Sequence, residues 1–196
     1  MEGLQLEKRP YAKQEYFEQL SKSQHKLEYI SGEIRMMSGG TLHHGTIVDN
    51  VFFNLRTNKG ACHVRSSEMA VAIQSQNRYY FPDASVVCGE DLKLEDNKGI
   101  ARMTNPCLIV EVISNSSVDI DRVEKFHAYR QLDSFKEYLL VDSRKMLIET
   151  FYREASDLWH IRSYFKEEQE VYIRTLDVNI PVSTFYEGVQ FEMEEN

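Results

Sequence analysis

One nearly continuous apolar run, Cys-Leu-Ile-Val-Glu-Val-Ile at residues 107–113, limits the fold of this chain more than any other segment. A strand that is apolar at consecutive positions is typical of the centre of a sheet that is covered on both faces. Residues 43–59 and 119–132 can supply covering helices, because their apolar side chains recur at steps of three and four residues. We therefore expect an α/β protein of the α+β-like kind, with a central mixed β-sheet flanked by helices and additional antiparallel strands.

Weaker patterns predict the remaining elements. Residues 14–23 are expected to form a short helix, and residues 26–38 a hairpin that turns at Ser31-Gly32. The other expected strands are residues 62–67, 69–74, 79–88, 137–142, 147–153, 159–165 and 170–176, with a loop at 89–105 and a closing turn or short helix at 182–186. The 196 residues contain no internal repeat and no low-complexity linker, so we expect one domain over residues 1–196.

The charge of the chain bears on the class of partner. The formal net charge is −8, which is unusual for a protein that binds a polyanion, because nucleic-acid affinity comes largely from Lys and Arg. Net charge is a sum, however, and a local basic face can coexist with acidic segments such as residues 90–96 and 187–195. The charge therefore does not exclude a nucleic-acid partner.

Hydropathy and cysteine usage predict the location of the protein. No apolar run approaches the roughly 20 residues that span a bilayer, and residues 1–10 are polar, unlike a signal peptide. The three cysteines, Cys62, Cys88 and Cys107, form no Cys-x-x-Cys pair and lie among apolar residues. We expect all three to be reduced thiols in the core, as in a reducing compartment. The protein is therefore expected to be cytoplasmic, without contact to a membrane.

Two carboxylates and a lysine are the candidate catalytic residues of this sequence. Asp83 opens an apolar segment directly after a proline, Glu111 interrupts the central apolar strand, and Lys125 lies on the following helix. A carboxylate in a central strand is costly to desolvate unless it is paired or bound to a metal. Carboxylates from adjacent strands can hold Mg²⁺ or Mn²⁺, and a nearby lysine can assist an attacking water or stabilise charge on a phosphoryl group.

Each of these residues also has an ordinary structural interpretation. Asp83 could form a turn with the preceding proline. Glu111 could be the buried ion-pair partner of Arg102, Lys125 or Arg130. Lys125 could be a solvated helix residue, as most lysines are. The occurrence of all three in this order and context favours a catalytic site over three separate coincidences.

The same residues carry a resemblance to known proteins. Pro82-Asp83, then Glu111 28 residues further on, then a lysine, resembles the active-site motif of the PD-(D/E)XK nuclease superfamily. More closely, the chain resembles the Uma-type family of restriction-endonuclease-like proteins, catalogued as a domain of unknown function. The matching segments are residues 27–34, 82–83, 109–114, 121–125 and 137–142, within a core of about residues 10–185.

One position departs from the superfamily motif. The lysine of that motif normally stands two residues after the glutamate, where this chain has Ile113. The resemblance implies that the lysine has migrated and that Lys125 is supplied by the next helix. The alternative is a degenerate, inactive site, in which case the protein is an interaction module with a nuclease fold.

The resemblance implies a restriction-endonuclease-like core and a function. Asp83, Glu111 and the backbone carbonyl of Val112 would bind Mg²⁺ or Mn²⁺, and the protein would hydrolyse phosphodiester bonds, with DNA as the expected substrate. A homodimer is expected because cutting both strands of a duplex suits a two-fold pair of sites. A metal-dependent hydrolase of a small phosphate ester stays open as an alternative, because the acidic charge suits a small substrate better than a polyanion.

Supporting residues are expected around this centre. Glu28 and Glu33 frame the first hairpin turn, and the superfamily often draws an extra acidic group from this region; the alternative is a surface charge pair. His44 at the start of the long helix can face the site or be an ordinary polar residue. Asp121 stands four residues before Lys125, so the two side chains can interact; Asp121 could orient the lysine or simply form a surface pair with it. Tyr129 and Tyr138 are expected to be packing residues.

Overall fold

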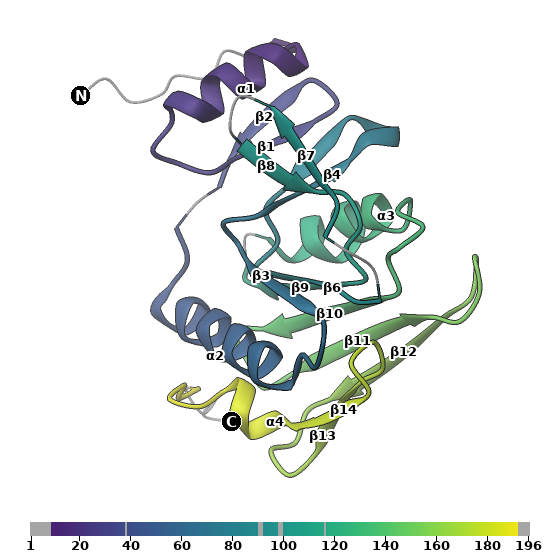
Figure 1. Ribbon diagram of the computed structural model, residues 1–196. Helices are drawn as coiled ribbons and strands as arrows, with labels where there is room; N and C mark the ends of the chain where they lie inside the picture. The colour runs from purple at the N-terminus through teal and green to yellow at the C-terminus, as the bar shows by residue number, and fades with distance from the viewer. Residues whose placement is uncertain (1–8, 38, 90–91, 98–99, 116, 192–196) are drawn as a thin grey trace.

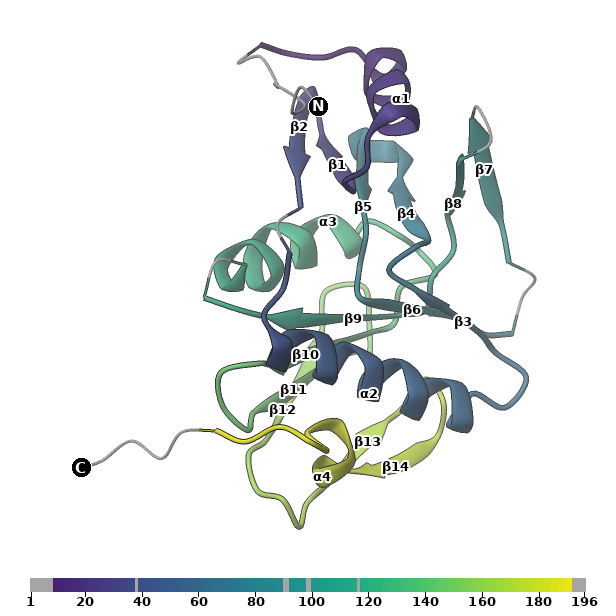
Figure 2. The same ribbon diagram turned by 90° about the vertical axis from the view of Figure 1, so that its left-hand side faces the viewer.

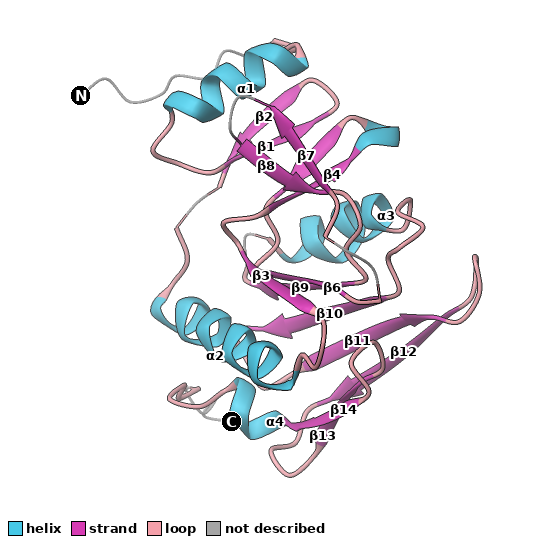
Figure 3. Cartoon of the chain, viewed as in Figure 1, coloured by secondary structure: helices cyan, strands magenta, loops and turns pink. Residues whose placement is uncertain are grey.

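The computed structural model describes residues 9–37, 39–89, 92–97, 100–115 and 117–191. The described strands form two six-stranded sheets and one two-stranded sheet. Figure 1 shows the first six-stranded sheet and helix α1 (Lys13–Lys22) at the top and the second six-stranded sheet below them, with α3 (Phe126–Tyr129) between the two. Figure 3 shows how strongly strands outnumber helices in this arrangement. The structure is therefore a mixed α+β fold, as the sequence predicted.

The lower sheet, called the core sheet below, contains the predicted central strand. Its order is β12-β11-β10-β9-β6-β3, and β9 pairs in parallel with β10 and antiparallel with β6. All six residues of β9 are buried, which confirms the interpretation of the apolar run. The strands are β3 (His63–Ser66), β6 (Ala84–Val87), β9 (Leu108–Ile113), β10 (Glu137–Asp142), β11 (Ile148–Arg153) and β12 (Trp159–Tyr164).

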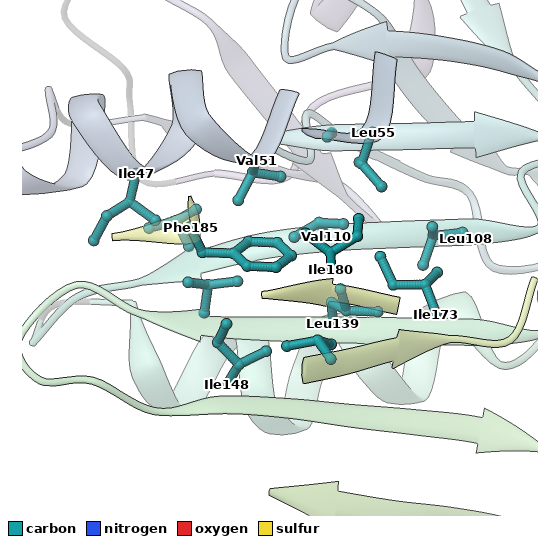
Figure 4. Packing of buried hydrophobic residues seen from close by; sticks show 14 of the residues in the cluster. Ile47, Val51, Leu55, Leu108, Val110, Leu139, Ile148, Ile173, Ile180 and Phe185 are labelled. Atoms are coloured by element: carbon teal, nitrogen blue, oxygen red, sulfur yellow. The ribbon is translucent and has the colours of Figure 1, made fainter. Parts of the chain in front are cut away.

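Both faces of the core sheet are covered. One face packs against α2 (Leu42–Asn58), α4 (Val182–Phe185) and the hairpin of β13 (Glu170–Ile173) and β14 (Val178–Pro181). Figure 4 shows this layer, in which side chains of α2 meet those of the sheet and of the hairpin. The other face packs against α3 (Phe126–Tyr129) and strands of the upper sheet. Figure 2 shows α2 and α3 on the two sides of β9.

The side chains of β9 alternate between these two layers, as the two-residue period of a strand requires. Leu108, Val110 and Val112 belong to the cluster under α2, whereas Ile109 and Ile113 belong to the cluster under α3. Successive side chains of a strand point to opposite faces. Glu111 therefore faces α3, and this decides which residues can reach it.

The upper sheet has the order β2-β1-β5-β4-β8-β7 and is covered by α1 (Lys13–Lys22). Tyr16 and Phe17 of α1 pack in an aromatic cluster with Tyr29 and Tyr79 of the sheet. The predicted hairpin is present, with positive φ at both Ser31 and Gly32, as a two-residue turn of this kind requires. The strands are β1 (Leu27–Ile30), β2 (Glu33–Met36), β4 (Ala70–Ile73), β5 (Arg78–Tyr80), β7 (Leu94–Asn97) and β8 (Ile100–Met103), with a short 3₁₀ helix η1 (Gln74–Gln76) after β4.

The prediction of one strand over residues 79–88 is wrong. The segment is divided into β5 in the upper sheet and β6 in the core sheet. The chain crosses between the sheets at Phe81-Pro82-Asp83, because Pro82 has no N–H to continue a ladder. This crossing places Asp83 at the junction of the two sheets.

The predicted loop at residues 89–105 contains the hairpin of β7 and β8, so that prediction is also wrong in part. Strand β8 was missed because it contains the charged residue Arg102, which interrupts the apolar pattern of a strand. Arg102 is nevertheless fully buried. Its guanidinium lies 4.1 Å from the ring centroid of Phe17, a cation–π contact that offsets part of the cost of burial. The short β14 was also missed.

The helix predicted at residues 119–132 begins with an irregular turn. Residues Ile120–Lys125 form a π-helical segment, η2, which continues directly into α3. A π-turn rotates the side chains that follow it, and such turns often occur at functional sites. The change of helix type cannot be inferred from a 3.6-residue period.

The prediction that all three cysteines are reduced is wrong for two of them. Cys62 and Cys88 form a disulfide, whereas Cys107 is free and buried. The register of β3 and β6 places His63 opposite Val87, so the next residues outward face one another. Their Cα atoms are 4.5 Å apart, within the range that a disulfide requires. Separately, the described helices include none that is long and apolar enough to cross a membrane.

Candidate active site

A cavity of about 760 Å³ lies where the core sheet, the upper sheet and η2 meet. Residues of the segment that connects β2 to α2 also line it. Seven residues singled out in the sequence line this one cavity: Glu28, His44, Asp83, Glu111, Val112, Asp121 and Lys125. The structure thus brings together residues that span almost a hundred positions of the chain.

Asp83 enters the cavity from the end of β6. Its Oδ2 accepts a hydrogen bond of 2.7 Å from the backbone N–H of Val112. The side chain is 13% exposed, so it can still reach a ligand in the cavity. Burial raises the pKa of the Asp83 carboxyl above its usual value, although His44 and the Val112 N–H oppose this shift.

Glu111 projects from the middle of β9 toward η2 and α3. Its Oε1 accepts hydrogen bonds from Lys125 Nζ at 3.2 Å and from the Tyr129 hydroxyl at 3.0 Å. Burial raises the pKa of the Glu111 carboxyl well above its usual range; Lys125 opposes the shift, and neighbouring carboxylates reinforce it. Of the partners left open by the sequence, Lys125 is the one found.

Lys125 is surrounded by carboxylates and is almost completely buried. Its Nζ lies 3.2 Å from Oε1 of Glu28 and 3.1 Å from Oδ1 of Asp121, in addition to the contact with Glu111. Burial by itself would lower the pKa of Lys125, but the surrounding carboxylates outweigh it and raise the pKa well above its usual value. These three carboxylate contacts favour the charged ammonium form of the side chain. Because Lys125 is buried, the interpretation as a solvated lysine is wrong.

Glu28 and Asp121 complete the surroundings of this lysine. Glu28 is buried on β1, and its Oε1 also accepts the backbone N–H of Phe81 at 3.3 Å. Asp121 is buried one helical turn before Lys125, and the predicted pairing of the two is confirmed. Both were also considered as surface charges, and that interpretation is wrong. Glu33, in contrast, is exposed and does not line the cavity.

His44 lies in the first turn of α2, whose N-cap is Thr41. Its backbone N–H donates to Thr41 Oγ1 at 3.2 Å, and its Nε2 lies 3.8 Å from Oδ2 of Asp83. Gly40 leaves room for the imidazole, because a Cβ at position 40 would be 2.6 Å from His44 Nδ1. The ring is therefore held between the backbone of residue 40 and Asp83.

Three residues at the site were missed or misjudged in the sequence. Tyr129 was expected only to pack, but its hydroxyl binds Glu111; its position four residues after Lys125 places both on one helix face, which is a signal that could have been used. Arg35 and Arg144 also line the cavity. Nothing in the sequence distinguishes these two arginines from the others.

The charges of the site favour a bound cation. Four carboxylates, those of Glu28, Asp83, Glu111 and Asp121, line the cavity together with one buried ammonium group. Buried negative charge in excess is unfavourable unless it is protonated or neutralised by a cation. The donor set fits Mg²⁺ or Mn²⁺, since these ions favour oxygen ligands and Mg²⁺ commonly takes one or two carboxylates and keeps several waters.

The backbone carbonyl of Val112 fits the same donor set. The N–H and C=O groups of one strand residue point to the same side, so this carbonyl is on the side of Asp83. If the register of Ala84 opposite Val110 continued, Val112 would face Pro82, which has no N–H to donate. As the side chains stand, no three His, Cys, Asp or Glu groups of the described residues surround one cation position, so waters would complete the coordination.

The fold is restriction-endonuclease-like. Its mixed sheet carries an aspartate and a glutamate on neighbouring strands, and the covering helix supplies a lysine. The comparisons with known proteins agree. The chain belongs to the Uma2 family, described as "putative restriction endonuclease", whose model matches residues 14–183.

Two relatives from Synechocystis sp. align with most of this chain. "Uncharacterized protein slr1290" is 29% identical over 181 residues, which are 91% of this chain and 92% of that protein. "Uncharacterized protein sll1609" is 30% identical over 159 residues, which are 80% of this chain and 89% of that protein. A crystal structure of a protein from Anabaena variabilis, described as a putative nuclease belonging to DUF820, matches with a TM-score of 0.69 at 14% identity. It covers 88% of this chain and 96% of that one, which shows that the fold is shared.

Proposed function

We propose that this protein is a metal-dependent endonuclease that hydrolyses phosphodiester bonds in DNA. The observation that carries the proposal is the position of Lys125, whose Nζ lies 3.2 Å from Glu111 although Ile113 occupies the usual lysine position. A lysine from the covering helix thus lies beside Glu111, which supports the migrated lysine that the resemblance implies. This argues against a degenerate site that lost its lysine.

Asp83, Glu111 and the Val112 carbonyl would hold Mg²⁺ or Mn²⁺. When bound, the ion would polarise the phosphoryl group and lower the pKa of a bound water. Glu111 would be kept in one orientation by the two hydrogen bonds to its Oε1. Asp83 would be kept in place by the N–H of Val112.

Lys125 would act as a charge rather than as a base. The surrounding carboxylates raise the pKa of Lys125, which favours its protonated form and a role as a charge over a role as a general base. A fixed ammonium group beside the metal ligands can instead stabilise the negative charge that develops on the phosphoryl oxygens. His44, whose Nε2 lies 3.8 Å from Asp83, would hydrogen-bond the same phosphate.

The second candidate is a hydrolase of a small phosphate ester. It is supported by the cavity of about 760 Å³, which has the size of a small-molecule site, and by the net charge of −8. Nucleotides and small phosphate esters assayed beside plasmid DNA separate the two candidates, because each predicts turnover of a different substrate.

The test of the main proposal combines metal binding with strand cleavage. Mn²⁺ titration by calorimetry on the wild type and on Asp83→Asn/Glu111→Gln should show binding that the double variant loses, and plasmid nicking should require Asp83, Glu111 and Lys125. A wild type that binds no divalent cation near millimolar concentration would overturn the proposal. Sedimentation in the same buffers tests the homodimer that we propose for cutting both strands.

A further inference from the structure

Two arginines, one from each sheet, line the cavity beside the candidate metal ligands. Arg35 belongs to β2 of the upper sheet, and Arg144 follows β10 of the core sheet. Neither belongs to the proposed metal site. Each is held in place by a carboxylate, and a guanidinium group in a fixed orientation is well suited to bind phosphate.

Arg144 is the more firmly held of the two. Its Nε and Nη2 donate to the two carboxylate oxygens of Asp142 at 2.8 and 2.6 Å, and its Nη1 donates to Oδ1 of Asn115 at 3.1 Å. The side chain is still 36% exposed. A guanidinium group has five N–H donors, so Arg144 can bind a phosphate oxygen without losing these bonds.

Arg35 has a similar arrangement. Its Nη1 and Nη2 each lie 3.3 Å from a carboxylate oxygen of Glu124, and Glu124 also accepts the Tyr80 hydroxyl at 3.1 Å. The Arg35 side chain is 28% exposed. The cavity therefore has one oriented cation from the upper sheet and one from the core sheet.

Three apolar side chains, called the apolar wall below, line the cavity from the end of β2 to the start of α2. Met36, Met37 and Leu42 line the cavity, and Leu42 is 84% exposed and Met36 45% exposed. Large apolar side chains exposed next to a polar site are unfavourable in water, and they can contact the flat face of a nucleobase. A nucleic-acid strand presents phosphates along its backbone and flat apolar faces on its bases. Arginines beside an apolar wall are suited to contact both.

The depth of the site decides between a single strand and a duplex. Glu111 and Lys125 are only 3% and 4% exposed, so the scissile phosphate has to enter the cavity to reach them. Duplex DNA is stiff, with a persistence length of about 150 base pairs, and cannot easily bend one phosphate into a recess. An unpaired strand is flexible and can splay a base against an apolar wall.

We propose that the substrate enters this site as an unpaired phosphodiester strand, with Arg35 and Arg144 binding its phosphates and Met36 and Leu42 contacting a splayed base. This inference rests on the proposed nuclease function and narrows its substrate class to single-stranded or frayed nucleic acid. Arg35 and Arg144 set the affinity through charge, whereas the apolar wall sets it through base contact.

The test measures binding by fluorescence anisotropy in Ca²⁺, which also takes oxygen ligands. The probes are a labelled DNA single strand, its blunt duplex and an RNA strand of the same sequence, and gels verify that each probe stays intact. The DNA single strand should bind at least about tenfold more tightly than the duplex, because only an unpaired strand can place a splayed base against the apolar wall.

Variants separate the two kinds of contact. Arg35→Gln and Arg144→Gln should each reduce the slope of log affinity against log salt by about 0.7, the value for one phosphate of a single strand. Leu42→Ser should weaken binding and leave the slope unchanged. The control is Arg9→Gln, because Arg9 is also half-exposed and paired with a carboxylate, Glu15, but does not line the cavity. If Arg144→Gln fails to fold, Arg35→Gln carries the same test.

The inference is overturned if the duplex binds as tightly as the single strand, or if neither arginine variant changes the salt dependence. Intact Mn²⁺ binding in the wild type with either of these results leaves the proposed nuclease function standing and removes only the inference. Tighter binding of RNA than of DNA supports an unpaired strand and overturns DNA as the substrate.

Discussion

Lys125 Nζ and Glu111 Oε1 lie 3.2 Å apart, although one residue belongs to a π-helical turn and the other to the central strand of the core sheet. Both side chains are buried, so the contact forms in a region of low dielectric. Lys125 at the same time contacts Glu28 and Asp121. Stability and the candidate chemistry therefore depend on the same ammonium group.

Replacing Lys125 by methionine should destabilise the protein by about 3–5 kcal/mol, because removal of one partner leaves buried carboxylates without their cation. Adding Glu111→Gln to Lys125→Met should restore part of this loss, since the second change removes one unpaired charge. Urea unfolding of the two single variants and the double variant measures the coupling. Additive losses would show that the two side chains do not interact as the structure indicates.

Tyr129→Phe should weaken Mn²⁺ binding by about tenfold to a hundredfold, the usual effect of removing a hydrogen bond to a metal ligand. The Tyr129 hydroxyl orients Glu111 at 3.0 Å. Tyr16→Phe is the matched control, because the Tyr16 hydroxyl also makes a buried hydrogen bond, to the Leu27 carbonyl, but lies in the aromatic cluster of α1. Equal Mn²⁺ affinity for wild type and Tyr129→Phe would remove Tyr129 from the site.

The parts of the candidate site that depend on local sequence patterns could be predicted. Glu111 was found because it interrupts an apolar strand, and Asp83 because it follows a proline. The side of the sheet that Glu111 faces, and hence its contact with Lys125, follows from the two-residue period once α3 is placed. These features are local, so the sequence contains them.

The features that were missed depend on tertiary contacts. Arg102 is buried against Phe17, so β8 lacks the apolar pattern of a strand. Cys62 and Cys88 meet through the register of two strands, which their spacing in the chain does not encode. Arg144 looks like any surface arginine until its bonds to Asp142 are seen.

Gly40→Ala should reduce nicking by about tenfold to a hundredfold if His44 contributes to the proposed site, because small displacements of a group at such a site have effects of this size. A Cβ at position 40 would be 2.6 Å from His44 Nδ1 and would push the imidazole away from its position next to Asp83. The control is Gly39→Ala, since a Cβ at position 39 meets nothing within 4 Å. Equal loss in both variants would point to the flexibility of the segment rather than to His44.

Loss of the Cys62–Cys88 disulfide should lower stability by about 3 kcal/mol, as expected for a closed loop of this length, and leave nicking unchanged. The disulfide follows the C-terminal end of β6 and of α2, whereas Asp83 and His44 lie at the opposite ends of these elements. Thermal unfolding of Cys62→Ser/Cys88→Ser, with and without reductant, measures the effect. Three reactive thiols in the oxidised, unfolded wild type, instead of one, would contradict the disulfide.

The Asp142–Arg144 pair predicts a dependence of stability on pH. Burial by itself would raise the pKa of the Asp142 carboxyl, but hydrogen bonds from Arg144 outweigh it and lower the pKa below its usual 3.8. A carboxylate with a lowered pKa in the folded state stabilises the protein above the pKa of the unfolded chain. This stabilisation is lost as the pH falls below 3.8 and through the lower folded value.

Asp142→Asn removes this carboxylate and keeps its size. Wild type should therefore be more stable than Asp142→Asn at neutral pH, and the difference between their free energies of unfolding should shrink as the pH falls through the acidic range. Urea unfolding across that range measures the difference. A difference that stays constant with pH would mean that Arg144 does not stabilise the ionised form of Asp142, and that its guanidinium group is not held in the orientation that phosphate binding requires.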